Sequence, residues 1–327
     1  MRTLASYLLA ACLALGVPAL AGGADAQAQA WPTKPIKIIL GYGAGGVADV
    51  MCRLVAQKLS VSLGQQVIID NRPGAGQIAA AQAVAKADPD GYTLLALNNG
   101  NAISASLFKS LPFDTANDFA PIAPMGFFGV FILANKGSPF HDLRAFIAAA
   151  KTHPGTLNIG ATSIGSTQNL SAELFKSMAG LDVIIVPFKS TPEMITALNR
   201  DELQAVFESP ATTLNFVRDG QLRALAITLP ARMASFSDIP TVAESGVPRY
   251  QVVTWNGIAA PARTPRGIID RLNKDTLAAV ALPDIQRKFA EYGIETREQT
   301  PEQFREVLTG DIAKWRDVIK AANIEPQ

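Results

Sequence analysis

The sequence predicts an α/β protein built from two lobes. Short β-branched runs alternate with apolar helical patterns along the chain, an alternation typical of a parallel sheet covered by helices on both faces. The alternation begins near residue 36 and begins again near residue 131. A chain of 327 residues is also long enough for two domains of ordinary size.

The first third of the chain contains three predicted strands and two predicted helices. The strands are residues 36–40, 67–69 and 92–97, the first of which lies between Pro35 and a run of glycines. An Ala-rich segment over 77–87 predicts one helix, which Pro89 ends. Apolar residues at positions i, i+3, i+4, i+7 and i+8 predict the other helix: Val47, Val50, Met51, Leu54 and Val55.

The same alternation continues through the second third. Strands are expected at 131–133, 157–159, 183–186, 203–207 and 222–227, and helices at 143–151 and 170–178. A further helix is expected to begin at Thr191, as the capping residue, with Pro192 at the first helical position.

The final third is mostly helical. Thr300-Pro301-Glu302-Gln303 is a capping box that opens a long helix. One face of this helix carries apolar residues, and we expect it to pack back on the first lobe: Phe304, Leu308, Ile312, Trp315 and Ile319.

Composition excludes several classes of function. Hydrophobic residues make up 48% and charged residues 17%, so the chain is neither disordered nor collagen-like. Lys and Arg number 29 against 28 Asp and Glu, which argues against nucleic acid as a partner. Two His and two Cys leave little for a metal or haem site, so we expect no cofactor and no metal.

Cys52 lies in an apolar helical pattern and is expected to be a buried hydrophobe and not a nucleophile.

Residues 1–30 have the pattern of a secretory signal peptide. Arg2 precedes an apolar stretch over 4–20, and Ala28-Gln29-Ala30 ends the segment as a cleavage motif. A transmembrane anchor is the alternative, but Gly16 and Pro18 interrupt a stretch that is barely long enough to span.

A lipoprotein-type cleavage box at Leu9-Ala10-Ala11-Cys12 is a second alternative to the signal peptide. Cys12 lies inside the apolar stretch, which argues against it. Soluble export is therefore the interpretation that we prefer.

A glycine-rich turn over 41–49 carries the clearest functional signal. It follows a strand and opens a helix, so its backbone N–H groups lie at the positive end of the helix dipole and can bind an anion. Some of its four glycines, Gly41, Gly43, Gly45 and Gly46, are expected to serve a positive φ, and the others a close approach of ligand to backbone.

A dinucleotide-binding oxidoreductase is an alternative interpretation of this glycine-rich turn. Gly41, Gly43 and Gly46 satisfy G-x-G-x-x-G, and Asp70 ends the next strand at the place of a ribose-binding acid. An exported protein has no ready access to a nicotinamide pool, and the motif alone has many false positives.

A second polar turn over 160–167 also lies between a strand and a helix. Its Ser163 loosely mimics the nucleophile of a hydrolase, but His141 and His153 both precede it, and the triad order requires a His after it. Hydroxyls and N–H groups at a helix start suit a carboxylate better, so no catalytic residue is expected. The two turns are expected to hold the two ends of one small anion.

Together these segments make the chain resemble the periplasmic substrate-binding proteins of tripartite tricarboxylate transporters, the Bug or TctC family. The resemblance covers residues 31–327 and rests on ordered motifs that include Gly45-Gly46-Val47-Ala48-Asp49, Asn71-Arg72-Pro73-Gly74-Ala75-Gly76, Pro89-Asp90-Gly91-Tyr92, Val186-Pro187-Phe188-Lys189 and Pro240-Thr241-Val242-Ala243-Glu244.

The resemblance implies a Venus-flytrap fold of the periplasmic-binding-protein type, with mixed or parallel sheets and a ligand cleft between the lobes. The first lobe would be residues 31–130 with 251–327, and the second 131–250. The protein would be a periplasmic monomer that binds a small mono- or dicarboxylate and delivers it to membrane permease subunits, or to a sensor. The expected ligand-binding residues are Tyr42, Gly43, Gly45, Gly46, Ala48, Asp49, Asn98, Asn99, Ser163, Ser166, Thr167 and Glu208.

Several positions depart from the usual pattern of the family and leave the ligand open. Asn169 stands where His is usual, and Ser163 and Ser190 where Gly is common. Glu208 replaces a more usual Asp, and it either binds a ligand amino group or faces away in a helix cap.

Two charged residues near the first turn have alternative roles. Arg72 either clamps a carboxylate or pins its own loop, and we favour the loop. Asp49 would repel an anion if it pointed inward, so we expect it to organise the loop N–H groups or to bind a bridging water.

Overall fold

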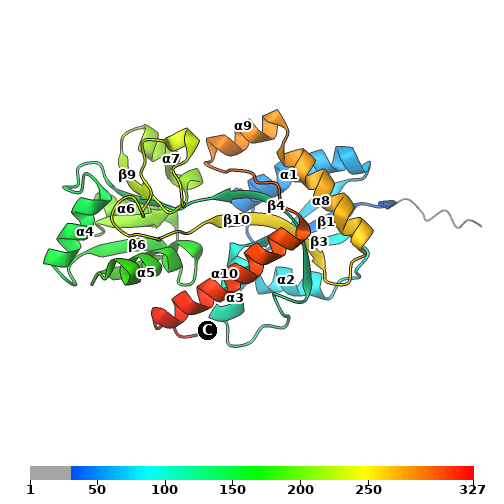
Figure 1. Ribbon diagram of the computed structural model, residues 1–327, viewed down its shortest axis with the longest axis horizontal. Helices are drawn as coiled ribbons and strands as arrows, with labels where there is room; N and C mark the ends of the chain where they lie inside the picture. The colour runs from blue at the N-terminus through cyan, green and yellow to red at the C-terminus, as the bar shows by residue number, and fades with distance from the viewer. Residues whose placement is uncertain (1–30) are drawn as a thin grey trace, which may run out of the picture.

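Residues 31–327 are described by the structure, a computed structural model, and the predicted signal peptide over 1–30 lies outside the described residues. Two five-stranded sheets lie side by side along the long axis of the molecule, each with helices packed on it, and define two lobes (Figure 1). This arrangement confirms the predicted two-lobed α/β fold. None of the helices within 31–327 is both long enough and apolar enough to cross a membrane.

The first lobe contains a mixed sheet. Strand β1 pairs in parallel with β2 and β3, and β10 runs antiparallel between β3 and β4. The elements of this lobe are β1 (Ile36–Leu40), α1 (Val47–Leu63), β2 (Val67–Asn71), η1 (Ala75–Gln77), α2 (Ile78–Ala85), β3 (Thr93–Asn98), α3 (Asn99–Leu107), β4 (Phe119–Phe128) and β10 (Thr254–Pro261).

The second lobe repeats this plan. Strand β6 pairs in parallel with β7 and β8, and β5 runs antiparallel between β8 and β9. Its elements are β5 (Phe131–Asn135), α4 (Leu143–Thr152), β6 (Asn158–Thr162), α5 (Thr167–Ala179), β7 (Ile184–Phe188), α6 (Thr191–Asn199), β8 (Ala205–Glu208), α7 (Pro210–Arg218) and β9 (Leu222–Ile227), followed by the short turn η2 (Ala234–Phe236).

Two predicted helix starts need correction. Ser190, and not Thr191, caps α6, because the Ser190 hydroxyl accepts from the backbone N–H of Glu193 and Thr191 is already helical. The helix predicted over 77–87 begins at Ile78, since Gln77 has a left-handed φ of 58° that interrupts the helical backbone.

The C-terminal helices pack on the first lobe, as predicted. Helix α8 (Arg266–Val280) lies against α1 and β4, and α9 (Pro283–Glu291) lies against α1 and α8. Helix α10 (Pro301–Ala321) crosses α3 and β4 and reaches α5 of the second lobe (Figure 1). The Thr300 capping box is confirmed, and Phe304, Leu308, Trp315 and Ile319 are buried on the predicted face while Ile312 is partly buried.

Cys52 is fully buried in the core between α1 and the first sheet. Burial raises the pKa of its thiol to about 12, so the thiol stays protonated at neutral pH. The expectation of a small buried hydrophobe is confirmed.

The chain crosses between the lobes at residues 129–130 and along 228–253, and one buried side chain ties the two crossings together. Thr228 Oγ1 accepts from Val130 N at 2.8 Å and donates to Val252 O at 2.9 Å. The Thr228 main chain adds bonds to the same two residues. Thr228 is therefore the polar centre of the connection.

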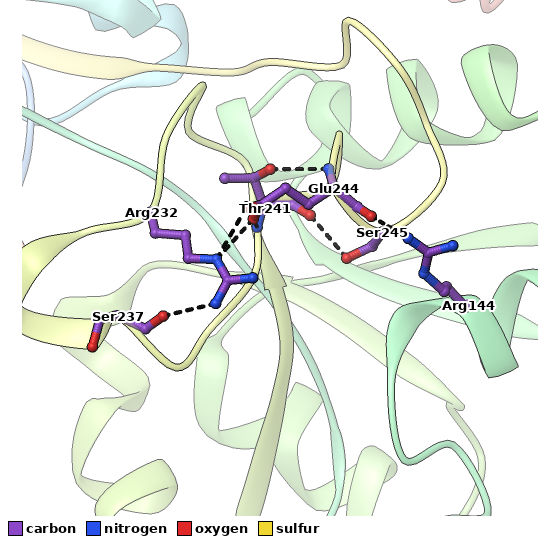
Figure 2. Close-up of polar contacts among 6 residues, drawn as sticks. All are labelled: Arg144, Arg232, Ser237, Thr241, Glu244 and Ser245. Atoms are coloured by element: carbon purple, nitrogen blue, oxygen red, sulfur yellow. Dashed lines mark hydrogen bonds and ion pairs between the residues drawn. The ribbon is translucent and has the colours of Figure 1, made fainter.

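The long crossing over 228–253 is also fastened to the second lobe. Figure 2 shows Glu244 and Thr241 exchanging hydrogen bonds across a short turn, with Arg232 paired to the Glu244 carboxylate at 2.9 Å. The Thr241 N–H and then the Arg232 guanidinium hold the pKa of Glu244 below its ordinary value. Arg144, on α4, donates to the Glu244 carbonyl, so this turn is anchored to the body of the lobe.

Candidate functional site

A cavity of about 910 Å³ lies between the lobes. Residues at the starts of six helices line it: α1, α2 and α3 from the first lobe, and α5, α6 and α7 from the second. Each helix start carries a partial positive charge and N–H groups that have no partner inside the helix. The cavity wall therefore favours an anion.

The start of α1 is one of the helix ends that have no side-chain cap. Gly46 is the N-cap and has no side chain to offer, so the first N–H groups, at Val47 and Ala48, have no side-chain cap among the described residues. Gly46, Val47 and Ala48 all line the cavity, together with Tyr42 and Gly43. The first glycine-rich turn thus presents bare backbone to the cavity.

The four glycines of this turn have different reasons to be glycine. Gly45 has a φ of 89°, which a Cβ disfavours, and a Cβ on Gly41 would meet the Gln77 side chain. Nothing lies within 4 Å of a Cβ built on Gly43 or Gly46. A positive φ thus explains Gly45 alone and packing explains Gly41, while the space beside Gly43 and Gly46 is open and their approach to a ligand stays a prediction.

Asp49 holds this turn in place from behind. Its buried carboxylate accepts at 2.9 Å from each of Gly45 N, Arg53 Nε and Asn71 Nδ2. Burial works against ionisation, but the hydrogen bonds from Arg53, Gly45 and Asn71 outweigh it and lower the pKa of Asp49. Gly45 and Asp49 are not among the residues that line the cavity. Asp49 thus has the loop-organising position that was expected of it.

Asn98 and Asn99 end β3 and begin α3, and both line the cavity. Asn98 exchanges two side-chain hydrogen bonds with Gln77, at 2.6 and 2.9 Å, and caps Gly100 N. Asn99 donates to Asp311 at 2.7 Å and accepts from Thr167 of the second lobe at 2.8 Å. Both amides are thus held in fixed orientations.

Gln77 is a cavity residue that the sequence analysis missed. Its left-handed backbone is rare for a residue with a side chain and is often found at functional sites. No sequence motif announces this conformation.

The second polar turn faces the first across the cavity. Ser166 Oγ accepts from Asn169 N at 3.1 Å and donates to Thr162 O at 2.5 Å. Asn169, where the family usually has His, accepts from Gly165 N at 3.0 Å. Ser163, Ser166 and Thr167 line the cavity, as expected from the sequence, and Gln168 joins them.

Three further residues of the second lobe line the cavity: Lys189, Thr191 and Ser209. They follow β7 and β8 at the carboxyl ends of the strands, where α/β folds bind ligands. Glu208 precedes Ser209 but is buried and does not line the cavity. Among the described lining residues there is no Asp or Glu side chain, and Lys189 is the one cation.

The floor of the cavity comes from β10 and the end of β4. It consists of Thr254, Trp255, Asn256 and Phe128. Trp255 Nε1 donates to Asp311 Oδ2 at 2.6 Å, which fixes the indole ring. No role was predicted for these residues from the sequence, because β10 was not predicted.

The residues on which the rival interpretations depend do not line the cavity. Arg72 donates to the Asp70 carboxylate at 2.9 Å, and Lys37 lies 3.8 Å from the same group. The proposed ribose-binding acid is therefore already paired, and Arg72 neither lines the cavity nor is free to clamp a carboxylate. His141 and His153 are not among the described lining residues either, so no histidine accompanies Ser163 there.

Comparison with known proteins gives a consistent result. The family model described as "Tripartite tricarboxylate transporter family receptor" matches residues 51–324. A UPF0065 protein of Bordetella bronchiseptica is 34% identical, and the match covers 96% of this chain and 91% of the relative's own length.

Two solved structures from Rhodopseudomonas palustris resemble the whole molecule. Rpa4515, solved with adipate, is 32% identical, with a TM-score of 0.80 over 91% of this chain and 100% of its own. MatC, solved with bound malate, is 29% identical, with a TM-score of 0.76 over 88% of this chain and 99% of its own.

Proposed function

Because the chain belongs to the tripartite tricarboxylate transporter receptor family, we propose that it is a periplasmic solute-binding protein that captures a small carboxylate between its lobes. Relatives solved with adipate and with malate support this class of ligand. The protein binds the solute and makes or breaks no bond in it, so it needs no catalytic residue, cofactor or metal.

The observation that carries the proposal is the meeting of six helix starts in one cavity whose described lining has no acidic side chain. Hydrogen bonds to a charged group contribute about 1.5–3 kcal/mol each. Three or four of them, less the cost of ordering the ligand and the lobes, reach roughly the −8 kcal/mol of a micromolar complex. The uncapped N–H groups of α1 and the start of α5 are the donors that we assign to the carboxylate.

Closure of the lobes is the second part of the proposal. Residues 31–130 with 251–327 form one moving body, and residues 131–250 form the other. A ligand that touches both shifts the population toward the closed form, because some contacts exist only when the lobes meet. Thr228 and the crossing segments form the hinge.

The closed complex then docks on permease subunits in the membrane and releases the carboxylate there. We place the protein in the periplasm, exported as a monomer by its leader over 1–30. A receptor that reports to a sensor is the alternative use of the same binding site, and co-purification with either kind of membrane partner separates the two.

A thermal-shift screen of the purified protein tests the proposal. We expect at least one small carboxylate to raise the melting temperature, and its neutral amide not to do so.

Gly46→Val puts a side chain into the open space beside the α1 start and should abolish this shift in melting temperature. Gly267→Val is the matched control, since Gly267 also lies near a helix start with nothing within 4 Å but is outside the cavity. If no carboxylate stabilises the protein and a nicotinamide dinucleotide does, the proposal fails.

A further inference from the structure

Behind the second-lobe wall of the cavity lies a carboxylate for which the proposed binding mode has no use. Glu208 ends β8 and is 2% exposed. It accepts from Ser209 N at 2.6 Å, from Gln168 Nε2 at 3.1 Å and from Thr191 Oγ1 at 2.7 Å. Within residues 31–327 it forms no ion pair, so hydrogen-bond donors alone compensate its charge.

Glu208 determines which hydrogen-bonding groups Gln168 and Thr191 can present to the cavity. An ionised carboxylate only accepts hydrogen bonds, so Gln168 must turn its NH₂ toward Glu208 and its carbonyl oxygen away. Thr191 has a single hydroxyl proton, which it gives to Glu208, so its oxygen retains only lone pairs. Both residues line the cavity, so the acceptors that they can offer to it are Gln168 Oε1 and Thr191 Oγ1, while the second Gln168 N–H remains a donor.

Ser209 adds a third polar group to this wall. It lines the cavity and is 7% exposed, yet its Oγ has no hydrogen-bond partner among the described residues. A buried hydroxyl without a partner is costly, and a ligand group that bonds to it recovers that cost.

We propose that this wall, made of the acceptors Gln168 Oε1 and Thr191 Oγ1 and the unpartnered Ser209 hydroxyl, with Glu208 behind it, binds a hydrogen-bond donor on the ligand. The inference rests on the proposed function and narrows it: the solute is a carboxylate that carries a hydroxyl or ammonium substituent. Glu208 is the specificity-determining residue. The starts of α1 and α5 are assigned to the carboxylate, whereas a second carboxylate at this wall would face the lone pairs of Gln168 and Thr191 and the buried charge of Glu208.

Lys189 lines the same cavity but does not reverse this preference. Its side chain is exposed, so water and salt screen its charge. The charge of Glu208 is buried and is screened far less.

Isothermal titration calorimetry with matched sets of acids tests the preference. Each unsubstituted acid is compared with its hydroxy and amino counterparts: succinate with malate and aspartate, propionate with lactate and alanine. We take the set whose members have the lower Kd values. In that set, we expect the hydroxy or amino acid to bind at least about fivefold more tightly than its unsubstituted parent. A smaller ratio overturns the inference and leaves the proposed function standing. If no carboxylate in a wider panel binds, the proposed function itself fails, and the inference with it.

Glu208→Gln tests the role of the buried charge. A glutamine offers its own N–H donors, so Gln168 and Thr191 are no longer held as acceptors, and the ratio between substituted and unsubstituted acids should fall toward one. If the affinities for the substituted and the unsubstituted acid fall by the same factor, so that their ratio does not change, Glu208 has only a structural role.

Two more variants complete the test. Ser209→Ala should lower the same ratio, and it addresses the same wall if Glu208→Gln does not fold. Glu202→Gln, an exposed glutamate outside the cavity, is the control and should keep the wild-type ratio. A Ser209→Ala protein that keeps the wild-type ratio would remove Ser209 from the wall.

Discussion

The Thr167 hydroxyl donates to Asn99 Oδ1 at 2.8 Å and joins the start of α5 in the second lobe to the start of α3 in the first. Asn99 Nδ2 in turn donates to Asp311 Oδ2 at 2.7 Å, and Asp311 also accepts from Trp255 on the cavity floor. Because the Asn99 NH₂ faces a carboxylate, its oxygen must face Thr167. A chain of hydrogen bonds thus runs across the cleft at the place where we expect the ligand.

Thr167→Val removes this link and keeps the shape of the side chain. A neutral hydrogen bond contributes about 0.5–1.5 kcal/mol, so we expect the Kd for the carboxylate to rise about three- to tenfold. Calorimetry measures the Kd, and small-angle scattering should find the lobes further apart. Thr309→Val, which loses only a bond to its own helix backbone, is the control. An unchanged Kd would show that the link plays no part in closure.

Gly165 packs the second turn against the first lobe. A Cβ on this residue would overlap the side chain of Leu107 on α3. We expect Gly165→Ala to hold the lobes apart, so that a saturating ligand no longer reduces the radius of gyration in small-angle scattering.

Gly180→Ala is the control for the backbone at Gly165. Its φ of 61° is close to the 77° of Gly165, but nothing lies within 4 Å of its Cβ. The left-handed backbone costs either alanine about 1–2 kcal/mol, so both variants should lose similar stability while Gly180→Ala still closes. Closure of Gly165→Ala would contradict the prediction.

The local part of the fold was predictable because apolar patterning is local. The predicted bounds 36–40 and 222–227 coincide with β1 and β9, since each is a short apolar run with a clear start and end. Strand β10 was not predicted, because Gly257 and Pro261 weaken its pattern. It forms a strand because β3 and β4 pair with it from both sides, and Gly257 is required there by Phe304 and the Ala123 carbonyl, which leave no room for a Cβ.

The site was predictable only where a turn precedes a helix. Both polar turns could be found from glycine and hydroxyl residues between a strand and a helix. Trp255 carries no such signal, because it lies within a strand and reaches the cavity through folding that brings distant segments together. Ser209 does lie between a strand and a helix, but α7 was not predicted. Glu208 shows the same limit: its neighbour in sequence is Ser209, but its side-chain partners are Gln168 and Thr191, on other helices.

The cross-cleft chain of hydrogen bonds should also be visible in the pH dependence of stability. Burial raises the pKa of Asp311, and the donors Trp255 and Asn99, with the charge of Lys314, only partly oppose it. Between the unfolded value, about 3.9, and this raised pKa, the folded state binds an extra proton. The contribution of Asp311 to the free energy of unfolding therefore falls as pH rises through that window.

Asp311→Asn isolates this contribution. We expect the stability difference, wild type minus variant, measured by urea unfolding between about pH 4 and 7, to decrease as pH rises. Other carboxylates, such as Asp49 with its lowered pKa, lose stability as pH falls, but they cancel in the difference. A difference that is flat or that grows with pH would contradict the raised pKa.

The two crossings between the lobes should depend on one hydroxyl. Thr228→Val leaves the Val130 N–H and the Val252 carbonyl without their side-chain partner in a fully buried place. A buried polar group without a partner costs about 1–3 kcal/mol, so urea unfolding should find a loss of at least about 1 kcal/mol. Thr228→Ser keeps both hydrogen bonds and loses one methyl group, worth about 0.8 kcal/mol. If the valine variant is as stable as the serine variant, the hydroxyl does not hold the crossings together, and the hinge must be stabilised by apolar packing alone.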